Sequence, residues 1–159
     1  MSKRVKSIDP QAALLRAADI CSKAEHCESE IREKLFNWGL EPTHHDQIID
    51  YLFDHKYIDT ERFARAFTND KVRFSGWGRI KIRLALRQKH IPSYAIDQAI
   101  EQIDLSTYLS NLNTMILSRS KRYDIDDYEE RNKICRQMMS RGYEPGLIIQ
   151  AINDIRSQR

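Results

Sequence analysis

The feature that most constrains the fold is an internal repeat with a period of about 50 residues. Three segments share one apolar pattern: IREKLFNWGLEP (31–42), IRLALRQKHIPS (82–93) and ICRQMMSRGYEP (134–145). Their first isoleucines are 51 and 52 residues apart. A second matching segment follows each of them: IIDYL (48–52), IDQAI (96–100) and IIQAI (148–152). A period of this length is typical of tandem supersecondary units.

Apolar residues recur every three or four positions in each unit, which indicates helices and not strands. We therefore predict an all-α fold of three tandem three-helix, helix-turn-helix-like repeats that form an elongated, curved array. The expected units cover 9–57, 58–104 and 105–159. Repeats of this kind mainly contact their neighbours and offer long binding faces, and they rarely enclose a catalytic pocket.

Turn residues set the expected helix ends. Asp9 followed by Pro10 predicts an N-cap and a first helical residue. Gly39 and Gly142 predict left-handed C-caps, and His90 stands at the equivalent place in the middle unit, where we expect a positive φ. The expected helices cover 10–22, 27–38, 44–55, 60–73, 77–89, 93–103, 106–122, 127–141 and 145–157.

Positive charge is concentrated in one stretch of the middle unit. From Lys71 to His90 there are seven basic residues and no acidic one, whereas the rest of the chain holds 19 basic and 23 acidic residues. Arg79, Arg83 and Arg87 follow at a four-residue spacing and form one helical ridge. Like charges at this spacing repel by roughly 0.2–0.5 kcal/mol per pair. A polyanion or an acidic protein surface would offset that repulsion.

The ridge helix opens with SGWGR (75–79), in which two glycines permit a sharp turn and a close backbone approach. Free amides at such a helix start are a phosphate site, and Trp77 either stacks on a base, anchors a protein contact or covers the core between units. Ile82 and Leu86 should hold the helix to its unit. The candidate residues for binding a partner or DNA are Lys71, Arg73, Trp77, Arg79, Lys81, Arg83, Arg87 and Lys89, with Lys71 and Arg73 expected at the end of the preceding helix.

The sequence gives little support for a catalytic or metal-binding site. The three cysteines, Cys21, Cys27 and Cys135, form an odd count that favours reduced thiols. The group Cys21, His26, Cys27, His44 and His45 matches no zinc spacing, and we expect solvated loop histidines and no metal or cofactor. No nucleophile is paired with a base, so we expect no enzyme.

No apolar run is long enough to span a membrane. The N-terminal sequence MSKRVKSIDPQAALL is basic, but its apolar part is too short for a signal peptide. We therefore expect a cytoplasmic protein without a membrane partner.

The segments YIDTERFARAF (57–67) and RFSGWGRIKIRLALRQKHI (73–91) resemble the central motif of the RecX family of recombination regulators, as does SEIREKLFNWGL (29–40). The matching residues are Asp59, Arg62, Phe63, Ala64, Arg73, Gly76, Gly78, Lys81, Ile82, Leu86 and Lys89. Arg79 and Ile80 stand where the family often has Pro and a basic residue.

The resemblance implies a non-enzymatic regulator of DNA repair, recombination and the SOS response. Such a protein binds the RecA–DNA filament and inhibits its ATPase, recombinase and strand-exchange activities. Some members also bind DNA directly. We expect a monomer that contacts single- or double-stranded DNA directly or through the filament. The alternative hypothesis is an autonomous DNA-binding protein of the helix-turn-helix type, whose affinity would fall steeply with salt.

Overall fold

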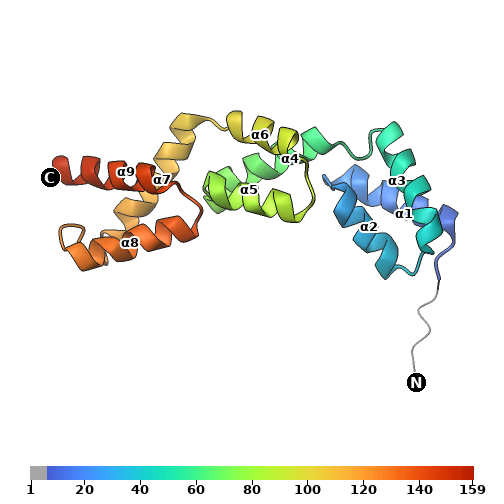
Figure 1. The fold of residues 1–159 in the computed structure, drawn as a ribbon, viewed down its shortest axis with the longest axis horizontal. Coiled ribbons are helices and arrows are strands. Elements are labelled where there is room, and N and C mark those ends of the chain that lie inside the picture. The colour runs from blue at the N-terminus through green and yellow to red at the C-terminus, as the bar shows by residue number, and fades with distance from the viewer. Residues whose placement is uncertain (1–6) are drawn as a thin grey trace, which may run out of the picture.

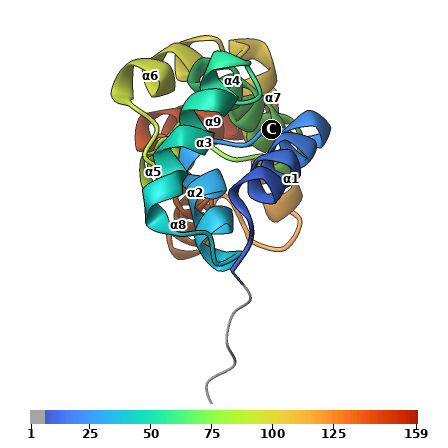
Figure 2. The ribbon, with the colours of Figure 1, turned by 90° about the vertical axis from the view of Figure 1, so that its right-hand side faces the viewer.

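The structure, a computed structural model, describes residues 7–159. The basic start of the chain, Met1–Lys6, lies outside the described residues, so the hypothesis about the N-terminal signal is not addressed there. Within the described range the chain forms helices and no strand. Figure 1 shows successive groups of helices arranged along one long axis, and Figure 2 views the array from the end that carries the first group. The prediction of an elongated all-α repeat fold is confirmed.

The helices have the following bounds. The first group contains α1 (Pro10–Lys23), α2 (Glu28–Asn37), a 3₁₀ turn (Pro42–His44) and α3 (His45–Asp54). The second contains α4 (Thr60–Asp70), a π-helical turn (Lys71–Ser75), α5 (Arg79–Gln88) and α6 (Ser93–Glu101). The third contains α7 (Leu105–Arg119), α8 (Tyr128–Ser140) and α9 (Pro145–Ser157). No described helix is both long and apolar enough to cross a membrane.

Each group begins in the same way, with an aspartate that caps its first helix. The carboxylate of Asp9 accepts hydrogen bonds from the Gln11 and Ala12 amides. Asp59 and Asp104 accept from the amides three residues further on. A capping carboxylate satisfies amides that have no helical partner. A capping aspartate therefore marks the start of the first helix in each of the three units.

The aligned apolar positions are buried in every unit. Ile31, Ile82 and Ile134 are all completely inaccessible to solvent. The turn that follows them is also repeated, because Gly39, His90 and Gly142 have φ values of 78°, 61° and 95°. The predicted positive φ of His90 is therefore confirmed.

Two predicted helix ends in the middle unit are wrong. We expected one helix over 60–73, but α4 ends at Asp70 and the chain continues as the π-helical turn. The Trp77 amide donates a hydrogen bond to the Lys71 carbonyl across this turn. We expected the next helix from residue 77, but it begins at Arg79 because Gly76 is left-handed and Gly78 is extended. The motif glycines therefore separate the π-helical turn from α5.

The units are joined in two different ways. The second and third units share one apolar core, which includes Ile82, Leu86, Tyr108 and Tyr143. The first unit has a separate core of its own. Of its buried residues, only Cys27 belongs to the core that the second and third units share. Ion pairs of Arg62 with Glu25 and of Lys89 with Glu30 connect the first and second units, whereas continuous apolar packing joins the second and third units.

Candidate binding surface of the middle unit

Helix α5 is fixed by its N-terminus to the third unit. The Gly78 amide donates to the Arg141 carbonyl over 2.8 Å, and the Ile80 amide donates to the Gly142 carbonyl over 2.9 Å. The Arg79 amide donates to the Tyr108 hydroxyl over 3.0 Å. The expected phosphate site at this helix start is therefore wrong, because protein acceptors already occupy these amides.

Arg79 lies inside this junction and not on a free ridge. Its guanidinium pairs with the Glu144 carboxylate at 2.9 Å and lies 4.2 Å from the centre of the Tyr108 ring. The Tyr108 hydroxyl donates to the other oxygen of Glu144 over 2.6 Å. Burial and this hydrogen bond raise the pKa of Tyr108 above its ordinary value. Tyr108 and Glu144 have no counterpart among the sequence candidates, because only the folded array brings them to Arg79.

Arg83 and Arg87 occupy the outer part of α5. Arg83 forms an ion pair with Asp97 of α6, and the Asp97 side chain is largely exposed. Arg87 is exposed and forms no ion pair with any residue in 7–159. An exposed ion pair contributes little to stability, since both charges remain hydrated. These two arginines are therefore available to an incoming partner.

Two apolar side chains are exposed beside the arginines. Ile80 and Leu84 are 52% and 54% exposed, and they are one helical turn apart on α5. They line an open hollow of about 460 Å³. The full set of lining residues is Arg79, Ile80, Arg83, Leu84, Arg87, Ile100 and Glu144. We call Ile80, Arg83, Leu84 and Arg87 the outer face of α5. The sequence offered one signal for it: Ile80 and Leu84 are apolar but fall outside the buried stripe of Ile82 and Leu86.

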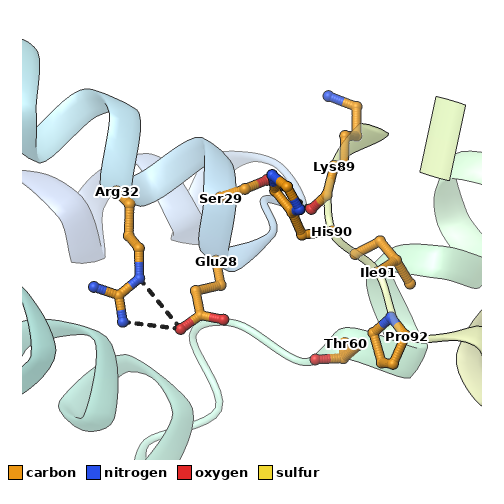
Figure 3. A pocket seen from close by; sticks show the side chains of 8 residues that line it. All are labelled: Glu28, Ser29, Arg32, Thr60, Lys89, His90, Ile91 and Pro92. Carbon is orange, nitrogen blue, oxygen red and sulfur yellow. Dashed lines mark hydrogen bonds and ion pairs between the residues drawn. The ribbon is translucent and has the colours of Figure 1, made fainter. Parts of the chain in front are cut away.

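Lys89 lies at the junction with the first unit. Its ammonium pairs with Glu30 at 3.2 Å, and its carbonyl accepts a hydrogen bond from the Ser29 hydroxyl over 2.8 Å. Burial tends to raise the pKa of Glu30, but the Cys27 amide and the Lys89 charge outweigh it and lower that pKa. Figure 3 shows the adjoining pocket, which is open between α2 and the turn after α5.

The motif residues Asp59, Arg62 and Phe63 have structural positions. Asp59 caps α4, and Phe63 is buried in the shared core. Arg62 donates to Glu25 over 2.6 Å and to the carbonyls of Lys56 and Tyr57. It therefore ties the first unit to the second.

Trp77 packs against the shared core, and two lysines lie over its ring. The Lys71 and Lys81 ammonium groups are 4.5 Å and 4.4 Å from the ring centre. The preceding aromatic residue in the sequence, Phe74, is 77% exposed, and it was not among the sequence candidates. The guanidinium of Arg73 lies 5.5 Å from the centre of its ring.

The expected loop histidines are only partly observed. His45 is the first residue of α3, where it is buried and its Nε2 lies 3.0 Å from the Leu40 carbonyl. The expectation of a solvated loop residue is therefore wrong for His45. Cys27 is buried and is the N-cap of α2. Within residues 7–159, no group of three or more His, Cys, Asp or Glu side chains is arranged to hold a metal ion.

These features define an all-α tandem-repeat protein that presents open faces on a basic middle unit. Comparison with known proteins identifies the family. Residues 59–100 match the family model of the second three-helix domain of RecX, and residues 107–152 match that of the third. The two matches together cover more than half of the chain, which belongs to the RecX family.

Similar proteins carry the name regulatory protein RecX. One from Prosthecochloris aestuarii is 26% identical over 147 residues, covering 92% of this chain and 95% of the relative. One from Yersinia enterocolitica is 28% identical over 162 residues, covering 89% of this chain and 96% of the relative. The crystal structure of RecX from Lactobacillus salivarius superposes with a TM-score of 0.80 at 20% identity, over 91% of this chain and 95% of that one. The family and these relatives support a regulatory role for this chain.

Proposed function

We propose that this protein binds a recombinase filament of the RecA type on DNA and inhibits its ATPase, recombinase and strand-exchange activities. It does so by occupying a surface of the filament and carries out no chemistry of its own. It acts as a monomer, built from units over 9–57, 58–104 and 105–159, and modulates DNA repair and recombination.

The observation that carries this proposal is the outer face of α5. Exposed apolar side chains beside arginines suit a protein-binding surface, because a partner can bury the apolar groups while the arginines contribute specificity. Helix α5 lies in the middle of the array, so a partner that covers this face can also contact neighbouring units (Figure 1). An elongated array of this kind fits a long, repetitive partner.

The alternative, an autonomous DNA-binding protein that reads a particular sequence, has less support. A recognition helix needs a free N-terminal end in the major groove. The start of α5 is covered by Arg141, Gly142 and Tyr108 of the third unit.

Two measurements test the proposal: co-sedimentation of the protein with a cognate recombinase filament, and the ATPase rate of that filament in the presence of the protein. Two double variants probe the outer face: Arg83→Glu with Arg87→Glu, and Ile80→Ser with Leu84→Ser. Both should abolish inhibition and leave the protein in the supernatant. The matched charge control is Arg65→Glu with Arg136→Glu, because both residues are exposed and have no ion pair within residues 7–159. The matched apolar control is Leu15→Ser with Ile149→Ser, which are similarly exposed.

Both control variants should inhibit as the unmodified protein does. Full inhibition by the Arg83/Arg87 and Ile80/Leu84 variants would refute the role of this face. An unmodified protein that stays in the supernatant in the presence of the filament would refute the proposed function itself.

A further inference from the structure

The seven cations of the basic segment fall into two groups. Arg79, Arg83 and Lys89 form ion pairs within the protein. The other four have no ion pair with any described residue, and they are Lys71, Arg73, Lys81 and Arg87. Three of these four lie over aromatic rings, two at Trp77 and one at Phe74. The unpaired positive charge is therefore concentrated around the π-helical turn and not along the arginine ridge.

Phe74 is the most exposed large apolar side chain in residues 7–159. It lies in the π-helical turn Lys71–Ser75, and turns of this type occur frequently at functional sites. Burying its ring in the shared core would stabilise the fold, yet Val72 of the same turn takes the buried position instead. The turn thus directs one apolar residue inward and Phe74 outward.

The third unit holds this turn in a fixed shape. The Asn111 side chain donates to the Val72 carbonyl over 2.9 Å. Arg141 and Tyr143 donate to the carbonyls of Ser75 and Gly76, each over 2.9 Å. Phe74 therefore sits on a preorganised backbone, and a ligand that contacts it pays little of the entropy that ordering a loop would cost.

The chemistry around Phe74 selects the kind of ligand. An apolar protein pocket would accept the ring, but it would leave the neighbouring cations unpaired. Duplex DNA would pair with the cations, but its stacked bases offer no face to the ring. Single-stranded DNA supplies both a free base face and phosphates, and its binding sites combine basic residues with aromatic stacking platforms.

We propose that the π-helical turn is a single-strand-specific DNA contact in which Phe74 stacks on an unpaired base. Arg73, Lys71 and Lys81 meet the phosphates on either side of that base. Residues 9–57 hold ten acidic and only five basic residues, so we expect the strand to run from the π-helical turn over the second and third units and not over the first. This contact is separate from the outer face of α5, so it does not rest on the proposed binding of a recombinase.

The test is fluorescence anisotropy of the full chain with a labelled oligodeoxythymidine and with a duplex of the same length, without any recombinase. Phe74→Ala should weaken single-strand binding about tenfold, because it removes the stacking of one base. Its affinity for the duplex should change less than about twofold. Phe74→Trp should retain single-strand affinity, whereas Phe74→Leu should lose as much as Phe74→Ala, because it is apolar but cannot stack.

The matched control is Phe36→Ala, since Phe36 is 71% exposed but lies on α2 of the acidic first unit; it should bind DNA normally. Three results would each overturn the proposal: wild-type single-strand affinity in Phe74→Ala or Phe74→Leu, an equal loss on single strand and duplex, or no single-strand binding by the unmodified protein at low salt. A Phe74→Ala variant that keeps its DNA affinity but no longer sediments with a recombinase filament would assign Phe74 to a protein contact instead.

Discussion

The backbones of Gly78 and Gly142 are in direct contact between the start of α5 and the turn after α8. A Cβ atom on Gly78 would lie 2.2 Å from the Gly142 carbonyl carbon, and one on Gly142 would lie 2.5 Å from the Lys81 amide nitrogen. The Gly78 and Ile80 amides donate across this contact to the carbonyls of Arg141 and Gly142. The second and third units are therefore held together by backbone atoms that any side chain would separate.

Replacing Gly78 by alanine should weaken this junction. The new methyl group collides with rigid backbone, and we expect the free energy of unfolding to fall by about 2–3 kcal/mol. Chemical denaturation measures this change. The control is Gly146→Ala in α9, where nothing lies within 4 Å of the added atom and helix propensity favours alanine. Equal stabilities of the two variants would contradict the close contact.

Stability should fall at alkaline pH because of buried phenols in the same junction. Burial raises the pKa of Tyr143 to about 12. Below the unfolded-state pKa of about 10 both states hold the proton, and the stabilisation by the neutral phenol is fully present. As the pH rises from about 10 to about 12 the unfolded state loses the proton first, so the contribution is lost, on the order of 2 kcal/mol.

Tyr143→Phe checks this assignment. The variant cannot ionise at this position and loses the hydrogen bond to the Gly76 carbonyl. It should be less stable than the unmodified protein at neutral pH, and its free energy of unfolding should fall less between pH 10 and 12. Denaturation curves recorded between pH 10 and 12 measure the free energy of unfolding of both proteins. If it falls equally with pH in both, the loss of stability does not come from Tyr143.

Arg62 should contribute more to the stability of the protein than its partial exposure suggests. Arg62→Ala removes the partner of the Glu25 carboxylate, whose second oxygen is already buried without a hydrogen bond. We expect a loss of about 1–2 kcal/mol in the free energy of unfolding, kept small by the partial solvation of both groups. Hydrogen exchange should show faster opening at the junction of the first two units. Arg65→Ala, at an exposed position on the same helix, should change stability by less than about 0.5 kcal/mol.

His90→Gly should stabilise the protein. His90 has a φ of 61°, a conformation that glycine adopts without the steric cost borne by other residues. We expect a gain of about 0.5–1 kcal/mol, measured as a higher thermal midpoint. Ala85→Gly, five residues earlier and in the interior of α5, should have the opposite sign, since glycine weakens a helix interior. A destabilised His90→Gly variant would indicate that the imidazole makes a contact worth more than the backbone strain.

The repeat predicted most of the helices because burial and turn chemistry act locally. Ile31, Ile82 and Ile134 could be aligned by eye, since a three- or four-residue spacing determines which side of a helix meets the core. The π-helical turn could not be predicted in this way. Its backbone carbonyls are held by Asn111 and Arg141, which are distant in the sequence.

The binding surface was predicted less well than the helices. The sequence located the basic segment but could not tell which cations were free. Arg79 looked equivalent to Arg83 and Arg87, yet it is paired with Glu144, 65 residues away. Phe74 carried no signal of its own, because an isolated aromatic residue after a helix is usually buried.

By itself, the sequence determined the number of units, the class of fold, the left-handed turns at Gly39, His90 and Gly142, and the place of the basic segment. Each of these depends on residues that are close together along the chain. The tertiary structure decided which charges are satisfied within the protein, which amides at the start of α5 are covered, and which aromatic ring faces solvent. Those outcomes depend on groups that only the packing of one unit against the next brings within hydrogen-bonding distance.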